Sequence, residues 1–151
     1  MRVLLQRVSR GSVTVDRATI GEIEAGYVLL TGITEGDSEA LVVKMAAKVA
    51  SLRLFPNEEG KFDRSLRDVG GGALVISQFT LYGEMRKGRR PSFSRAAAPA
   101  LAEPLVARFA QALREAGVER VETGEFGASM QVDLCNDGPV TLMLDSAELF
   151  G

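Results

Sequence analysis

Two stretches of the chain repeat apolar residues at helical spacing, and short apolar strands fill the sequence around them. The first helix is expected after a capping residue, Asp37 or Ser38. Its stripe consists of Leu41, Met45, Val49 and Leu52. The second helix is expected to begin between Ala100 and Pro104, because proline is tolerated in a first turn, and to end at Gly117. Its stripe consists of Leu105, Phe109 and Leu113.

Strands are predicted wherever apolar residues alternate with polar ones or run on without a break. They cover residues 1–10, 12–16, 19–24, 27–33, 53–55, 73–79, 118–123, 130–134 and 140–145. Residues 57–72 are polar and glycine-rich, which predicts a long loop. Asp137-Gly138, between the last two strands, has the sequence of a hairpin turn.

This grouping of strands around two helices predicts an α/β fold of α+β character. We expect one domain over residues 1–151, with a curved, mixed, mostly antiparallel sheet. The sheet would form a half-barrel, and the two main helices would pack outside it.

The residue types exclude several kinds of chemistry. The chain has no histidine and one cysteine, Cys135, so it has no Ser-His-Asp or Cys-His unit and no histidine or thiolate zinc site. We expect neither a metal nor a cofactor. A lone cysteine fits a reducing compartment, the apolar runs are too short to cross a membrane, and the N-terminus does not resemble a signal peptide. These features predict a cytoplasmic protein.

Polar side chains and cations meet where the strand over residues 73–76 ends. Ser77, Gln78 and Thr80 follow this strand directly. Residues 86–95 then carry five cations and no acid, although the net charge of the chain is −2. This junction predicts a small site beside a phosphate-binding surface. The alternative is a strand-end cap followed by a loop whose cations are only solvated.

Three segments of the chain resemble signature sequences of the D-aminoacyl-tRNA deacylase family. They are SQFTLYG at residues 77–83, MRKGRRPSF at residues 85–93 and NDGPVTL at residues 136–142. Residues 1–16 and 124–130 are similar to the family too, whereas Glu35 lies where members often carry a histidine. The resemblance implies a hydrolase that cleaves the ester between a D-amino acid and the terminal ribose of tRNA. It also implies action on glycine mischarged on tRNA(Ala), and a role in chiral proofreading.

The resemblance assigns roles to particular residues. Ser77, Gln78, Phe79 and Thr80 would line the catalytic site, at the boundary of a homodimer. Gly138 and Pro139, joined by a cis peptide bond, would reach in from the partner chain and screen chirality through their backbone. Phe126 and Met130 would bound the pocket, although core packing explains them equally well. Arg86, Lys87, Arg89 and Arg90 would bind tRNA phosphates. The family uses no metal and relies on the 2′-hydroxyl of the tRNA.

The residues themselves leave the mechanism and the function open. An aminoacyl ester is already activated, so backbone N–H groups at Phe79 and Thr80 would suffice to stabilise an oxyanion. Thr80 as a covalent nucleophile is the alternative, but no activating base is visible in the sequence. Two other functions compete with the deacylase: an RNA-binding module without catalysis, and a small-molecule acyl hydrolase that uses Thr80.

Overall fold

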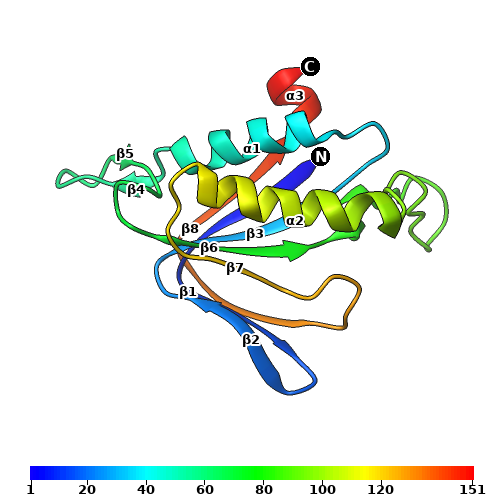
Figure 1. The fold of residues 1–151 in the computed structure, drawn as a ribbon, viewed down its shortest axis with the longest axis horizontal. Coiled ribbons are helices and arrows are strands. Elements are labelled where there is room, and N and C mark those ends of the chain that lie inside the picture. The colour runs from blue at the N-terminus through cyan, green and yellow to red at the C-terminus, as the bar shows by residue number, and fades with distance from the viewer.

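Strand β1 (Arg2–Val15) is the axis of the fold, because it pairs with three other strands. The computed structural model describes residues 1–151 (Figure 1). β1 is antiparallel to β2 (Ala18–Ile23), β3 (Gly26–Gly32) and β8 (Gln131–Asp145). β6 (Gly72–Ser77) lies parallel to β3, and β7 (Val121–Thr123) lies parallel to β6. The predicted mixed, mostly antiparallel sheet is confirmed.

The sheet curls into a half-barrel because β2 folds back over β6 and β7. A Cβ atom added to Gly21 of β2 would lie 3.0 Å from the carbonyl oxygen of Thr123 and 3.4 Å from the side chain of Leu74. Glycine at this position therefore permits the close approach of the strands. Buried apolar side chains fill the inside of the curl: Val8, Val13, Ile23, Val28, Leu74 and Ile76.

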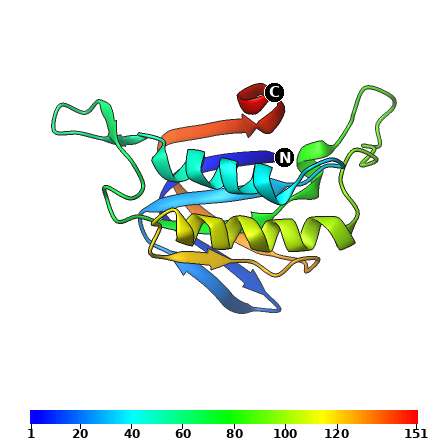
Figure 2. The same ribbon diagram turned by 45° about the horizontal axis from the view of Figure 1, so that its top comes forward.

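Helices α1 (Glu39–Ser51) and α2 (Pro99–Glu115) lie side by side on the outer face of the sheet (Figures 1 and 2). Oγ of Ser38, one of the two predicted capping residues, accepts a hydrogen bond from the N–H of Leu41 and caps α1. The main core between helices and sheet includes Tyr27, Leu29, Met45, Val49, Phe109 and Leu113. The two predicted helices are confirmed. A third, α3 (Ser146–Phe150), is too short to show a helical repeat in the sequence.

Residues 131–145 form one strand, β8, so the predicted hairpin turn at Asp137-Gly138 is wrong. Both halves of β8 pair with β1, and between them residues 137–140 bulge out of the ladder. The side chain of Asn136 closes the base of the bulge. Its Oδ1 accepts a hydrogen bond from the N–H of Val140 at 2.8 Å, and its Nδ2 donates to the carbonyl oxygen of Val140 at 3.2 Å. Bulges and hairpin turns favour the same residue types, which explains the error.

Three other boundaries differ from the prediction. β1 is one strand where two were predicted, because Gly11 stays in the sheet and pairs with both β2 and β8. Residues 57–72 are not entirely loop, since β5 (Phe62–Arg64) pairs there with β4 (Phe55–Pro56). β6 stops at Ser77, and a single 3-10 turn, η1 (Phe79–Tyr82), follows it.

The start of α2 also differs from the prediction. The helix begins at Pro99, which suits the first helical position because its missing N–H has no partner there. Pro104 therefore lies inside the helix instead of at its start. Only one backbone bond in the first turns of the helix is lost, and the helix continues to Glu115.

Two excursions project from opposite ends of the sheet. The β4–β5 hairpin projects at one end, and the loop between η1 and α2 projects at the other (Figures 1 and 2). No helix of the structure combines the length and the apolarity needed to cross a membrane.

Candidate active site

A cavity of about 340 Å³ opens where β6 ends. Its walls come from the end of β3, the segment around Ser77 and Gln78, the approach to α2, the first turns of α2, and the segment around Phe126. Most of the lining is apolar, and none of its side chains is ionisable. The cavity therefore offers shape and hydrogen bonds, but no acid or base of its own.

The η1 turn forms one rim of this cavity. The N–H of Gln78 donates to the carbonyl oxygen of Thr31 at 2.8 Å, which holds the turn against the end of β3. The side chain of Gln78 donates through Nε2 to Oγ1 of Thr80. No side chain caps the turn, so the N–H groups at its start, on Phe79 and Thr80, are left for an acceptor outside it.

Thr80 has no base to activate its hydroxyl. Tyr82 is the one ionisable residue of η1, and burial raises the pKa of its phenol to about 12, helped by the carboxylates of Asp37 and Asp145. Tyr82 therefore stays protonated near neutral pH. The turn can hold an ester and donate hydrogen bonds to an oxyanion, but it does not activate a nucleophile.

The peptide bond between Gly138 and Pro139 is cis, as the resemblance implied. It lies in the bulge of β8, and we call residues 137–139 the proline turn. Gly138 has a φ of 146°, and a Cβ atom there would lie 2.7 Å from the side chain of Val140. Arg7 is buried beneath the turn and donates from Nε to the carbonyl oxygen of Asp137 at 2.9 Å. The turn is therefore tied to β1.

The proline turn and the cavity lie at different levels of the sheet in one chain. Arg7, which holds the turn, pairs with Tyr27 at the start of β3. Ser77, at the cavity, pairs with Thr31 near the end of β3. Extended strand separates the two levels by roughly 13 Å. A single chain therefore does not bring the two predicted parts of the site together.

The two predicted pocket residues of the 124–130 segment lie in different places. Phe126 lines the cavity. Met130 does not: it packs against the small core inside the curl, and a Cβ atom added to Gly124 would lie 2.6 Å from its sulfur. Within one chain, Met130 is a partly buried residue at the edge of this core.

The predicted phosphate-binding cations lie on residues 84–92, which we call the basic loop. Glu84 and Ser92 close its base through an antiparallel bridge. Arg86 lies 3.4 Å from the carboxylate of Glu84. Three further exposed cations of the loop have no acidic partner: Lys87, Arg89 and Arg90. Phe93, which follows the loop, lines the cavity, so the base of the loop lies beside the cavity.

Sequence reasoning did not identify Arg7 as a site residue, although a signal was present. Val3, Leu5 and Arg7 are alternate residues of β1, so Arg7 continues the face on which Val3 and Leu5 are buried. A cation on the buried face of a strand requires acceptors. In the structure these are the carbonyl oxygens of Asp137 and Leu54. The α2 wall of the cavity gave no comparable signal.

Comparison with known proteins identifies relatives that match along the whole chain. The family model for D-Tyr-tRNA(Tyr) deacylase matches residues 4–145. A D-aminoacyl-tRNA deacylase from Thermomicrobium roseum is 61% identical over 151 residues, which are 100% of this chain and 97% of that protein. A protein of the same name from Symbiobacterium thermophilum is 52% identical over 150 residues, covering 99% of each chain.

Solved structures agree in fold. The structure of a c-Myc DNA unwinding element binding protein is 39% identical, with a TM-score of 0.89 over 96% of this chain and 98% of that one. A "probable eukaryotic D-amino acid tRNA deacylase" is 20% identical, with a TM-score of 0.81 over 95% of this chain and 97% of that one, and it supports the fold alone. The family model and the relatives together show that this chain belongs to the D-Tyr-tRNA(Tyr) deacylase family.

Proposed function

We propose that this protein removes D-amino acids from tRNA at a site built from the cavity of one subunit and the proline turn of another. Membership of the family makes the chain a D-aminoacyl-tRNA deacylase, a hydrolase that acts on ester bonds. The observation that carries the proposed mechanism is the cavity itself, which is rimmed by free backbone N–H groups and lined by no ionisable side chain.

Hydrolysis at such a site depends on positioning. Water attacks the carbonyl carbon of the ester, and the N–H groups of Phe79 and Thr80 stabilise the oxyanion that forms. The bond between that carbon and the ribose oxygen then breaks, and the proton lost by the water passes to the ribose oxygen. The neighbouring 2′-hydroxyl of the tRNA relays this proton, because the cavity supplies no side chain that accepts one. Ser77 and Gln78 hold the substrate at the strand end.

The separation of the proline turn from the cavity supports a site shared between two chains. The turn lies about four strand residues from the level of the cavity within one chain, so it would have to enter the cavity of a second copy. The exposed apolar side chains of β8 support such an assembly. They are Val132, Leu142 and Met143. Exposed apolar side chains on the strand that carries the turn suit a homodimer contact.

Chirality would be read by the backbone of the proline turn. The carbonyl groups around Gly138 and Pro139 would accept hydrogen bonds from the ammonium of a D-residue, and the side chain of an L-residue would then face the wall of the cavity. Glycine has no side chain to exclude, so glycyl-tRNA(Ala) is a substrate in this scheme. Phe126 lines the cavity beside this position, whereas Met130 packs against the small core inside the curl of the same chain.

The basic loop would hold the tRNA beside the cavity. Its cations, Arg86, Lys87, Arg89 and Arg90, would contact phosphates near the acceptor end without reading base identity. This suits proofreading of many tRNAs in the cytoplasm, where aminoacyl-tRNA is used.

A second candidate function is nucleic-acid binding without catalysis. The relative named c-Myc DNA unwinding element binding protein, together with the basic loop, favours it. Release of tyrosine from D-Tyr-tRNA(Tyr) and from L-Tyr-tRNA(Tyr), and of glycine from Gly-tRNA(Ala), separates the two functions. We expect the D-tyrosyl and glycyl esters to be cleaved and the L-tyrosyl ester to survive. Binding of tRNA without cleavage of any ester would favour the second function.

Subunit mixing tests the shared site. Ala96→Phe fills the cavity, and Gly138→Ala disturbs the proline turn because of its φ and the contact with Val140. Each variant alone should be inactive. After the two are unfolded and refolded together, a dimer with one subunit of each kind has one intact site, so about a quarter of wild-type activity should return. A site contained in one chain would give no recovery.

A further inference from the structure

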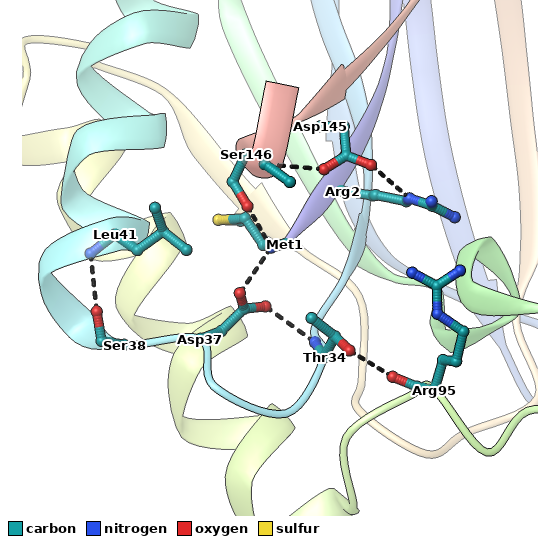
Figure 3. Close-up of polar contacts among 10 residues, drawn as sticks. Met1, Arg2, Thr34, Asp37, Ser38, Leu41, Arg95, Asp145 and Ser146 are labelled. Carbon is teal, nitrogen blue, oxygen red and sulfur yellow. Dashed lines mark hydrogen bonds and ion pairs between the residues drawn. The ribbon is translucent and has the colours of Figure 1, made fainter. Parts of the chain in front are cut away.

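The side chain of Arg2, at the start of β1, holds three partners at once. Its Nε donates to Oδ2 of Asp145 at 2.8 Å, as Figure 3 shows. Its Nη1 donates to the carbonyl oxygen of Leu81 at 2.9 Å. Its Cζ lies 4.7 Å from the centre of the Tyr82 ring. Two of these three partners belong to η1, the turn that carries the N–H groups of Phe79 and Thr80.

The ring of Tyr82 extends this contact to the other side of the cavity. The ring is buried, and a second guanidinium lies near it: Cζ of Arg95, on the chain segment that leads to α2, is 5.8 Å from its centre. The carbonyl oxygen of Arg95 accepts a hydrogen bond from Oγ1 of Thr34 (Figure 3). Ala96 follows Arg95 directly and lines the cavity. The contacts of Tyr82 with Arg2 and Arg95 therefore connect η1 with the facing wall.

Arg2 is itself held by a rigid element. It pairs with Asp145 across the β1–β8 ladder, and Asp145 also accepts a hydrogen bond from the N–H of Ala147 at 3.0 Å. Burial alone would raise the pKa of Asp145, but the bonds from Arg2 and Ala147 hold it below its ordinary value. The carboxylate thus stays charged and keeps the guanidinium aimed at η1.

We propose that Arg2 is a positioning residue for ester hydrolysis, which fixes the η1 turn from behind so that the N–H groups of Phe79 and Thr80 keep the geometry needed to bind an oxyanion. It acts through Leu81 and Tyr82 and does not contact the substrate. This role rests on the proposed function of the cavity.

The chemistry of the contact requires arginine. The planar guanidinium donates in two directions while its face covers an aromatic ring. Lysine keeps the charge but is a point donor, and glutamine keeps a hydrogen bond but loses both the charge and the stacking. The other anchors of the turn are the bond from the N–H of Gln78 to Thr31 and the edge-to-face contact of Phe79 with Phe93, and neither holds its far end at Leu81 and Tyr82. Small displacements of a catalytic donor are costly, so loss of Arg2 should affect rate more than binding.

The test compares Arg2→Gln and Arg2→Lys with Ser146→Ala. Ser146 lies at the same end of the sheet, where its Oγ accepts a hydrogen bond from the Met1 ammonium at 2.7 Å without touching η1 (Figure 3). It therefore controls for loss of stability in this region. Kinetics with D-Tyr-tRNA(Tyr) give kcat and KM separately. Amide hydrogen exchange of peptides over residues 77–83 reports on the turn itself, independently of activity.

We expect Arg2→Gln to lower kcat by about tenfold or more with KM changed less than about twofold. Exchange over residues 77–83 should become faster, while α1 is unaffected. Arg2→Lys should lie between Arg2→Gln and wild type, and Ser146→Ala should keep wild-type kcat and wild-type exchange over residues 77–83. If Arg2→Gln does not fold, the kcat of Arg2→Lys and its amide exchange over residues 77–83 test the proposal instead.

Two results would overturn the proposal: wild-type kcat and exchange in the folded Arg2 variants, or an equal fall of kcat in Ser146→Ala. An inactive wild-type protein would instead contradict the proposed function. Faster exchange of the turn in Arg2→Gln would then still establish the contact as the anchor of η1.

Discussion

Nε of Arg7 lies 2.9 Å from the carbonyl oxygen of Asp137, the residue before the cis Gly138-Pro139 bond. The same guanidinium donates from Nη1 to the carbonyl oxygen of Leu54 at 2.6 Å. It also lies within 6 Å of the ring centres of Phe55 and Phe62, so its charge is surrounded by acceptors and aromatic faces. The proline turn is thus positioned by its own chain before any second subunit is present.

Arg7→Lys should weaken chiral discrimination. Lysine cannot span both carbonyl oxygens in the geometry of the guanidinium, so the proline turn loses its fixed orientation. We expect the ratio of kcat/KM for D-Tyr-tRNA(Tyr) to that for L-Tyr-tRNA(Tyr) to fall about tenfold, as the loss of one charged hydrogen bond implies. Arg10→Lys, at an exposed position of the same strand, is the control and should keep the wild-type ratio. An unchanged ratio in Arg7→Lys would mean that the orientation of the proline turn does not determine chiral selection.

Met143→Glu should separate the subunits. The Met143 side chain of β8 is 48% exposed, and a carboxylate in the centre of an apolar contact is costly. Light scattering should show monomers, the far-ultraviolet circular dichroism should match wild type, and deacylation should be lost. Val69→Glu places the same charge at an apolar side chain that is 39% exposed and lies outside β8, and it should remain dimeric and active. A monomeric but fully active Met143→Glu would exclude a shared site.

Arg89→Ala/Arg90→Ala should raise the KM for tRNA and leave kcat near wild type. Each phosphate contact adds about 0.7–0.9 to the slope of log affinity against log salt, so the slope should become shallower by up to roughly 2. Lys44→Ala/Lys48→Ala removes the same charge from α1 and should leave the slope unchanged. If both double variants have the same slope of log affinity against log salt, the cations of the basic loop are solvated and do not contact phosphates.

Removal of metal ions should not affect activity. The chain lacks histidine, and its one cysteine is exposed, so the usual soft ligands of a catalytic zinc site are missing. We expect full deacylation after exhaustive dialysis against a chelator, provided that the tRNA is shown to remain folded. Activity that disappears and returns with added zinc would contradict this expectation.

The sequence predicted the elements whose signal is local. Helical spacing placed α1 and α2, and the polar residues at the end of β6 placed the candidate site at a strand end where the structure has a cavity. The hairpin prediction failed because Asn136 closes a bulge through its own side chain, and residue type alone does not separate a bulge from a turn.

Contacts between distant segments were not available from the sequence. Arg2 reaches Leu81 and Arg7 reaches Asp137 only after β1 has paired with β3 and β8. Arg2 and Arg7 both lie among apolar residues of the strand. This indicates that their side chains have partners, but it does not identify those partners. The cavity wall formed by α2 likewise depends on how the helix packs against the sheet, which no local pattern encodes.

Asp145→Asn should destabilise the protein at neutral pH but not in acid. Burial opposes the charge of Asp145, but the bonds from Arg2 and from the N–H of Ala147 hold its pKa below the ordinary value of 3.8. A carboxyl whose pKa is lowered by folding stabilises the folded state above its unfolded pKa, and this contribution is lost as the pH falls through the folded pKa.

The pair is partly exposed, so a difference of about 1 kcal/mol in the free energy of unfolding between wild type and Asp145→Asn is expected at pH 7. Asparagine still accepts the bond from Ala147 and preserves the cap of α3. The difference should shrink below pH 3.8 as Asp145 takes up a proton. Urea unfolding curves of both proteins, recorded at the same protein concentration, measure this difference at pH 7 and near pH 3. A difference that is the same at both pH values would mean that Asp145 contributes through packing and not through its charge on Arg2.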